Sequence, residues 1–163
     1  SGLACGKILG KQELGYRKGI PRGGGPYILI SKKFIDVFPP LSKNIRNDRC
    51  FIDVVYNKEL HKATCAYVYH NDKHIDNPQS GRDEYRLYLN KSIHPGEGVF
   101  KPDDVVFFRK IENDSNEPLI HITHIPEYNP SEFAKIAQPM SKDLRNKNFM
   151  VESSHLSQLP SFK

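Results

Sequence analysis

Residues 99–108 are Val-Phe-Lys-Pro-Asp-Asp-Val-Val-Phe-Phe, a polar turn followed at once by four apolar residues. Pro presets its own backbone torsion and Asp hydrogen-bonds to nearby backbone groups, so both residue types favour turns. The β-branched and aromatic run that follows is typical of a buried strand. We therefore predict a β-turn over Pro102–Asp104 that leads into a core strand over Val105–Phe108.

Apolar segments on both sides of this stretch also have the length and composition of strands. Residues 84–90 alternate, with apolar side chains on one face and Arg86 and Tyr88 on the other. A turn is predicted over Asn57–His61. The predicted strands are residues 3–9, 27–30, 51–56, 62–70, 84–90, 105–108 and 119–125. Six or seven strands separated by turns, with almost no helix, predict a mainly β barrel or sandwich.

Two segments favour short helices. Ser31 can cap the first, which ends at Pro39. Asn129 and Pro130 favour the start of the second, over about residues 130–138. The chain then becomes polar and Ser-rich. We divide it into a β domain over residues 1–125 and a C-terminal extension over 126–163, consisting of a helix and a polar tail.

The basic residues are concentrated in the first third of the 163-residue chain. The net charge is +5 overall; residues 1–50 carry ten Lys and Arg against three acidic residues, a net charge of +7, and residues 51–163 carry −2. Such asymmetry favours a polyanionic partner, with nucleic acid first. A basic but otherwise ordinary solvated surface is the alternative.

The sequence lacks the features of membrane-spanning and secreted proteins, which narrows the expected cellular compartment. No run approaches the ~18 apolar residues of a transmembrane helix, and the N-terminal residues are unlike a signal peptide. Cys5, Cys50 and Cys65 are too few and too scattered for a disulfide scaffold or a four-Cys zinc site, so we expect reduced, mostly buried thiols. The chain does not begin with Met, and we expect a piece of a longer cytoplasmic protein.

Two polar loops lie between predicted strands. Residues 10–25 contain six Gly interleaved with basic and amide side chains, which suits an extended arm along a duplex. Residues 69–86 are nearly neutral and mix carboxylates, amides and Arg. Phosphate contacts need only Lys and Arg, whereas base edges are contacted by Asn, Gln, Asp, Glu and Arg as well. We interpret the first loop as a backbone grip and the second as a base reader, the alternative for each being an ordinary solvated loop.

Catalytic motifs are not visible in this sequence. Asp103 and Asp104 superficially resemble the first element of a metal-dependent nuclease site, but no Asp/Glu-x-Lys follows them. His121 and His124 lie three apart in a predicted strand, so they face opposite sides and do not suit a zinc pair. We expect no catalytic residues, no metal site and no cofactor.

The order of the segments resembles a known family of DNA-binding domains. Tyr27–Pro39 is similar to the strand–helix element of the plant B-three transcription-factor domain. Residues 84–90 and 100–108 are similar to its last strands, whose signature ends in Gly-Asp-Val-Val-x-Phe. The chain departs from the plant pattern in having no Trp and in having Ser31 in place of Pro. It fits better the bacterial relatives, the DNA-recognition domains of type II restriction endonucleases of the EcoRII, BfiI and NgoAVII types, with the NgoAVII type preferred.

This resemblance implies an open seven-stranded DNA-binding pseudobarrel with two short helices, here followed by a helical or irregular C-terminal extension. It implies two arms in the major groove, between the first and second and between the fourth and fifth strands. It also implies double-stranded DNA with a short specific site as partner, a separate catalytic nuclease domain of the same protein or complex, and a bacterial cytoplasmic location. The candidate N-arm residues are Lys11, Gln12, Tyr16, Arg17, Lys18 and Arg22. The candidate C-arm residues are Tyr69, His70, Asn71, Asp72, Lys73, His74, Asp76, Asn77, Gln79 and Arg82.

Two other functions remain open at this point. One is a self-contained metal-dependent nuclease that uses Asp103 or Asp104. The other is a β-barrel that binds RNA or single strands without sequence preference, which would stack bases on exposed aromatic side chains.

Overall fold

The structure of the chain is a computed structural model. It describes residues 3–10, 13, 16–17, 20–21, 27–34, 37–69, 83–89, 93, 99–112, 118–125, 148–152 and 154. Ten strands and one three-residue 3₁₀ turn are found in these residues. They are β1 (Leu3–Ile8), β2 (Tyr16–Arg17), β3 (Ile20–Pro21), β4 (Ile28–Ile30), η2 (Lys32–Phe34), β5 (Arg49–Tyr56), β6 (Glu59–Tyr69), β7 (Asp83–Leu89), β8 (Val105–Ile111), β9 (Leu119–Ile125) and β10 (Asn148–Glu152).

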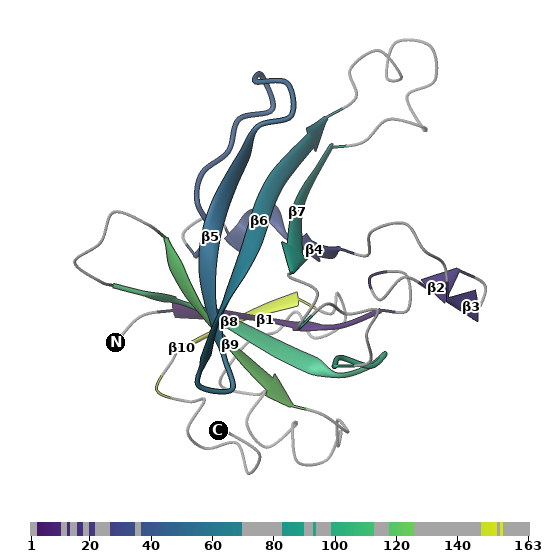
Figure 1. Ribbon diagram of the computed structural model, residues 1–163, viewed down its shortest axis with the longest axis vertical. Helices are drawn as coiled ribbons and strands as arrows, with labels where there is room; N and C mark the ends of the chain where they lie inside the picture. Colours follow the sequence, from purple (N-terminus) through teal and green to yellow (C-terminus); the bar gives the residue numbers. More distant parts are fainter. Residues whose placement is uncertain are drawn as a thin grey trace.

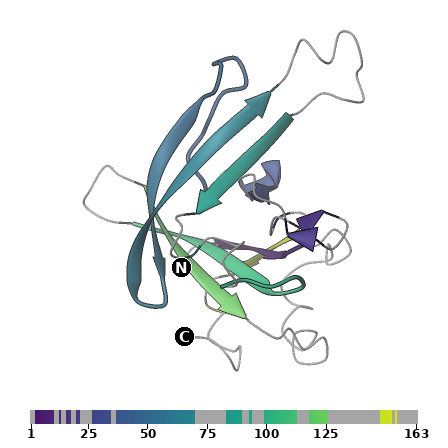
Figure 2. The same ribbon diagram turned by 45° about the vertical axis from the view of Figure 1, so that its right-hand side comes forward.

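Eight of these strands form one curled sheet in the order β10-β1-β8-β9-β5-β6-β7-β4. Neighbouring strands are antiparallel except β5 and β9, which pair in parallel from Asp53↔Leu119 to Tyr56↔Ile122. Figures 1 and 2 show the part of the sheet formed by β5, β6, β7 and β4 crossing the part formed by β1, β8 and β9. The curled sheet therefore encloses a core without closing into a barrel. The prediction of a mainly β, open seven-stranded pseudobarrel is confirmed for the strands within residues 3–125.

The eighth strand of the sheet was not expected. Residues 148–152 form β10, which pairs antiparallel with β1 from Leu3↔Glu152 to Lys7↔Asn148. The interpretation of this part as a polar tail was therefore wrong at these residues, because the tail supplies an edge strand. The predicted helix over about 130–138 lies outside the described residues.

Of the two short helices predicted, the first is found as the η2 turn. Phe34 accepts hydrogen bonds from the backbone N–H groups of Val37 and Phe38, and Ser31 caps the turn through its contact with the Lys33 N–H. Phe38 then packs edge-on against Phe108, with ring centroids 5.3 Å apart. This turn therefore covers part of the inner face of the sheet.

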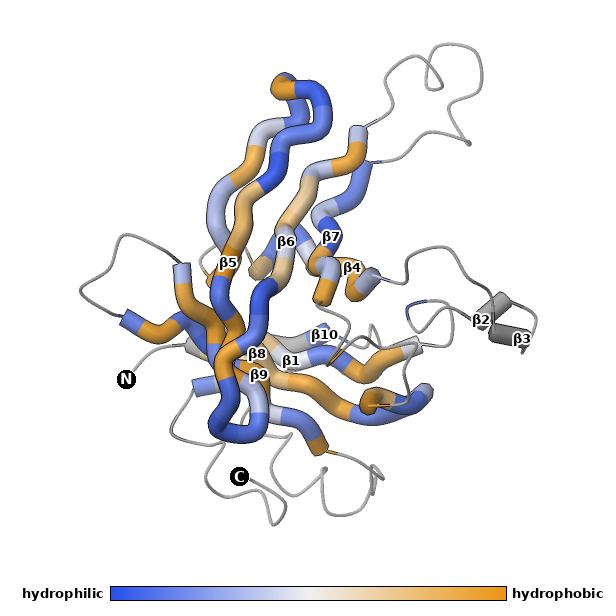
Figure 3. The backbone as a smooth tube through the Cα atoms, viewed as in Figure 1, coloured by the Kyte–Doolittle hydropathy of each residue, from blue (hydrophilic) through white to orange (hydrophobic). Residues whose placement is uncertain are grey.

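The core lies on the inner face of the curled sheet. Alternation places Tyr85, Leu87 and Leu89 inside, as predicted, and Glu84, Arg86 and Tyr88 outside. Figure 3 shows this alternation along β5, β6 and β7 and a concentration of hydrophobic residues on β8 and β9. Residues 105–108 are buried on both faces of β8, which explains their continuous apolar run.

Two turns position the strands, and both contain non-glycine residues with positive φ. Asn57 and Lys58, with φ of 52° and 66°, form the two-residue turn of the β5–β6 hairpin. Asp103, with φ of 72°, lies in the predicted turn before β8, which the Asp104 N–H closes on the Lys101 carbonyl at 3.0 Å. This matches a type II turn, in which Gly is preferred at the Asp103 position.

Candidate nucleic-acid interface

The two predicted arms fall at the connections that the resemblance implies. The N-arm joins β1 to β4, the first and second strands of the main sheet along the chain, and the C-arm joins β6 to β7, the fourth and fifth. Strands β4 and β7 pair from Ile28↔Leu87 to Ile30↔Tyr85. The strands into which the two arms return are therefore neighbours, although the arms are about 60 residues apart in the sequence.

Few of the candidate arm residues lie in the described part of the chain. Tyr16 and Arg17 form β2, which pairs with β3 through Tyr16↔Pro21 and Arg17↔Ile20. Figure 1 shows this small hairpin apart from the main sheet. Tyr69 ends β6, where its ring lies 5.7 Å from the Lys43 ammonium. The remaining candidates lie outside the described residues: Lys11, Gln12, Lys18, Arg22, His70, Asn71, Asp72, Lys73, His74, Asp76, Asn77, Gln79 and Arg82.

Glu13 ties the beginning of the N-arm to both strands that flank it. Its Oε2 lies 2.6 Å from the Lys7 ammonium of β1 and accepts a 3.0 Å hydrogen bond from the Leu29 N–H of β4. Its Oε1 accepts a 3.0 Å hydrogen bond from the Gly10 N–H. Lys7 also donates to the Leu29 carbonyl at 2.5 Å and is itself buried. One carboxylate thus joins the arm, β1 and β4.

Asp83 performs the corresponding role at the base of the C-arm. It accepts a 2.7 Å hydrogen bond from the Lys32 ammonium and another from the Tyr67 hydroxyl. These two donors, Lys32 first, hold the pKa of the Asp83 carboxyl below its usual value. Because Tyr67 is on β6 and Lys32 is in η2, the contact fixes the first residue of β7 to two other elements.

The outer face between the arm bases carries an ordered cluster of four side chains. Arg86 binds Glu84 through its Nε and Nη2 atoms at 2.8 and 2.7 Å and donates to the Tyr88 hydroxyl at 3.1 Å. Its guanidinium lies 4.0 Å from the centre of the Tyr27 ring. The positive charge of Arg86 is therefore largely neutralised by its ion pair with Glu84. The alternation of residues 84–90 predicted that Arg86 and Tyr88 face outward, but nothing local predicted Tyr27 beside them.

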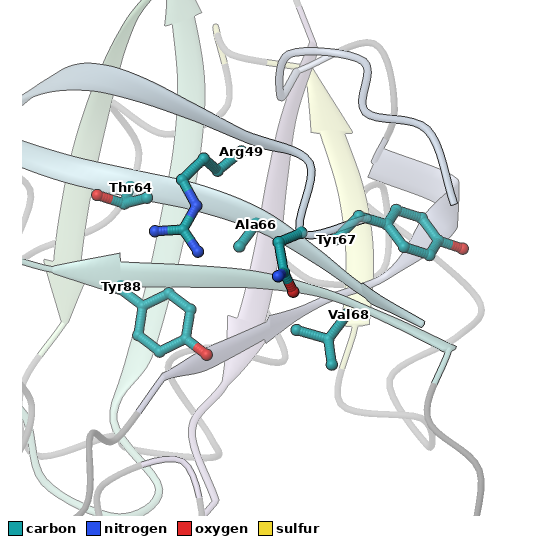
Figure 4. A pocket seen from close by; sticks show the side chains of 7 residues that line it. Arg49, Thr64, Ala66, Tyr67, Val68 and Tyr88 are labelled. Carbon is teal, nitrogen blue, oxygen red and sulfur yellow. The ribbon is translucent and has the colours of Figure 1, made fainter. Parts of the chain in front are cut away.

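A pocket opens on the same outer face and was not anticipated from the sequence. It has a volume of about 410 Å³ and lies over β5, β6 and β7. Figure 4 shows the Arg49 guanidinium reaching across β6 toward Tyr88, between Thr64 and Ala66. The lining residues are Asn47, Arg49, Thr64, Ala66, Tyr67, Val68 and Tyr88.

Asp104, one of the two carboxylates considered for a nuclease site, is held in a hydrogen-bond network of structural residues. The buried Asp104 accepts hydrogen bonds from the Lys101 N–H at 2.8 Å and from His124 Nε2 at 2.6 Å. His124 Nδ1 lies 3.0 Å from the Tyr56 hydroxyl, so the network joins β5, β9 and the turn before β8. His121 instead contacts Thr123, with Nδ1 to Oγ1 at 3.4 Å. In the described ranges, no group of three or more His, Cys, Asp or Glu residues is placed to hold a metal ion.

Two comparisons with known proteins gave no relative. A scan against models of protein families found no match, and a search of the curated proteins found no significant similarity.

Within the part of the chain that the structure describes, no helix is long and apolar enough to cross a membrane.

Proposed function

We propose that this chain is a B-three-like domain that recognises a short sequence in double-stranded DNA through two major-groove arms. The observation that carries the proposal is topological. The basic Gly-rich loop and the mixed polar loop are the β1–β4 and β6–β7 connections, and they return into the paired strands β4 and β7. Two arms that return into neighbouring strands suit a grip on a duplex from two sides, with phosphate contacts positioning the protein and base contacts selecting the site.

The turn before β8 supports the same family assignment. The Gly of the family signature Gly-Asp-Val-Val-x-Phe aligns with Asp103, and the Asp aligns with Asp104. Asp103 has a φ of 72°, a conformation that Gly adopts without cost. Asp104 closes the turn with its carboxylate on the Lys101 N–H. The backbone thus has the shape for which a Gly-Asp pair is suited.

We further propose that the parent protein is a type II restriction endonuclease of the bacterial cytoplasm, with catalysis in a separate domain. In this arrangement the chain selects the site and needs no cofactor of its own. We propose a duplex as its DNA partner, because the two loops return into the paired strands β4 and β7 and so suit a grip from two sides.

The direct test is selection of bound duplexes from a randomised pool at near-physiological salt with excess non-specific competitor. Recovery of one short motif supports the proposal and identifies the target. Recovery of unbiased sequence, or preferential binding of single strands or RNA, contradicts it. Once a motif is known, Arg82→Ala, Asn77→Ala or Asp76→Ala should each cost about 1–3 kcal/mol on that motif only, whereas Arg17→Ala should weaken binding to every duplex.

The self-contained nuclease is tested by incubating the chain with plasmid DNA and Mg²⁺. We expect intact plasmid. If the plasmid is cut, Asp103→Gly is the informative variant, because Gly suits the positive φ at this position and only the carboxylate is lost. Cleavage by the wild type that Asp103→Gly abolishes would establish the nuclease and overturn the recognition-only function.

A further inference from the structure

The pocket over β5, β6 and β7 is lined by side chains that offer hydrogen-bond donors. Arg49, Thr64 and Tyr88 lie on three adjacent strands. Thr64 and Tyr88 face outward because each lies between two buried neighbours, and Arg49 is exposed beside the half-buried Cys50. Strand pairing places Arg49 beside Ala66 and Thr64 beside Tyr88. The three side chains therefore meet above the middle strand, β6, as Figure 4 shows.

The charge of Arg49 is available to a ligand, unlike that of Arg86. Among the described residues, no ion pair or hydrogen bond to the Arg49 guanidinium is found, and Arg49 is exposed. Arg86, two strands away, is held by Glu84. None of the seven described lining residues is acidic. Over the residues that the structure describes, Arg49 is thus a cation without a charge partner, and it lines a pocket.

The hydroxyl groups around Arg49 complement this charge. Tyr88 accepts a hydrogen bond from Arg86 at 3.1 Å, which leaves its own O–H free to donate. Thr64 contributes a second hydroxyl and Asn47 an amide group. A guanidinium with two hydroxyl donors matches the oxygens of a phosphate, which Arg contacts in a bidentate manner.

The pocket lies between the bases of the two arms. Its residues Tyr67 and Val68 directly precede Tyr69, at which β6 ends and the C-arm begins. On its other side, the Tyr88 ring lies 5.7 Å from the ring of Tyr27, the residue before β4 at the end of the N-arm. A polymer held by both arms would pass close to this face.

We infer that this pocket binds one backbone phosphate of the DNA duplex, with Arg49 as its charged contact and Thr64 and Tyr88 as hydroxyl donors. This inference rests on the proposed function, since it needs a duplex held by the arms. It adds a binding site outside the arms, on the sheet itself. A phosphate contact carries no sequence information, so the site should strengthen cognate and random binding alike.

The test is duplex binding by Arg49→Gln, measured by fluorescence anisotropy from 50 to 300 mM salt on cognate and random DNA. Losing one phosphate contact should lower affinity roughly tenfold on both duplexes and reduce the slope of log K against log salt by about 0.9. Arg49→Lys keeps the charge and should keep most of the slope while losing the bidentate contact. Arg49 is exposed, so both variants should unfold like the wild type in urea.

Lys110→Gln is the matched control. It removes one exposed positive charge from β8, which β9 separates from β5. The inference stands if Arg49→Gln lowers affinity and slope beyond this control. If the wild type binds DNA and the two variants behave alike, the phosphate site is wrong and the proposed function survives. If the wild type binds no duplex at any salt, the proposed function fails and the phosphate site with it.

Discussion

At the scale of single residues, the Glu13 side chain holds the beginning of the N-arm against β1 and β4. Its side chain is 15% exposed and that of its partner Lys7 is 7% exposed, so the ion pair is nearly shielded from water. Removing one member of a buried pair leaves the other charge uncompensated, at a cost of about 3–5 kcal/mol.

We therefore expect Glu13→Gln to lower the free energy of unfolding by about 3 kcal/mol, measured by urea denaturation. Glu59→Gln is the control, because the Glu59 side chain is 76% exposed and its His61 contact is 3.7 Å long. That variant should lie within about 0.5 kcal/mol of the wild type. Equal stabilities for the two variants would show that the Lys7–Glu13 pair does not hold the arm.

His121 should make the protein sensitive to mild acid. Burial, and secondly the nearby charge of Arg109, lower the pKa of His121 below its ordinary value of 6.5. Below pH 6.5 the unfolded chain takes up a proton that the folded chain resists, so stability is lost as pH falls through the lowered folded pKa.

We expect the melting temperature of the wild type to fall more steeply from pH 7.5 to pH 5 than that of His121→Gln, which cannot be protonated there. The comparison of the two curves isolates His121 from the other titrating groups. Parallel curves would contradict this prediction.

At the scale of the elements, the β5–β6 hairpin contains an unfavourable residue in its turn. Lys58 has a φ of 66°, a left-handed conformation that costs an ordinary side chain about 1–2 kcal/mol. Gly adopts it freely, and the sequence Asn-Gly is the preferred two-residue hairpin turn. Part of the gain is offset by the greater freedom of Gly in the unfolded chain.

Lys58→Gly should therefore stabilise the protein by about 0.5–1 kcal/mol in urea denaturation. Lys110→Gly provides the comparison, because Lys110 is exposed within β8, where Gly should destabilise by about the same amount. A loss of stability in both variants would mean that the turn conformation is not the one described.

The sequence predicted most elements of the main sheet because each has a local signal. The turn at Pro102–Asp104, the outward facing of Arg86 and Tyr88, and the strand at 51–56 all follow from side chains within a few residues. Strand β10 carries no such signal, since Asn148–Glu152 lies in a polar segment and is stabilised by pairing with β1. Most of the thiols are buried, as predicted: Cys5 and Cys65 are buried and Cys50 is half-buried, and burial raises the pKa of Cys65 to about 12.

At the scale of the whole molecule, β10 determines whether β1 is an inner or an edge strand. β1 pairs with β8 on one side and β10 on the other, and Met150 of β10 packs against the core. A chain cut after Ile125 would leave the β1 hydrogen-bonding groups unpaired on one side, and exposed strand edges promote association.

We expect the chain truncated after Ile125 to be less stable in urea than the full chain, and to form oligomers in light scattering. Truncation after Glu152 is the control, because it retains β10. If both truncated chains behave like the full chain, β10 contributes nothing and the domain boundary predicted at residue 125 is sufficient.

The sequence by itself determined seven strands of the main sheet, the turn before β8 and which loops are rich in basic or mixed polar residues. These properties depend on consecutive residues, whose spacing and chemistry are visible without a structure. Only the tertiary structure decided that β5 pairs in parallel with β9, that Glu13 joins β1 to β4, and that Arg49 meets Thr64 and Tyr88 in one pocket. These contacts join residues far apart along the chain, and each depends on strand order and register, which local patterns do not encode.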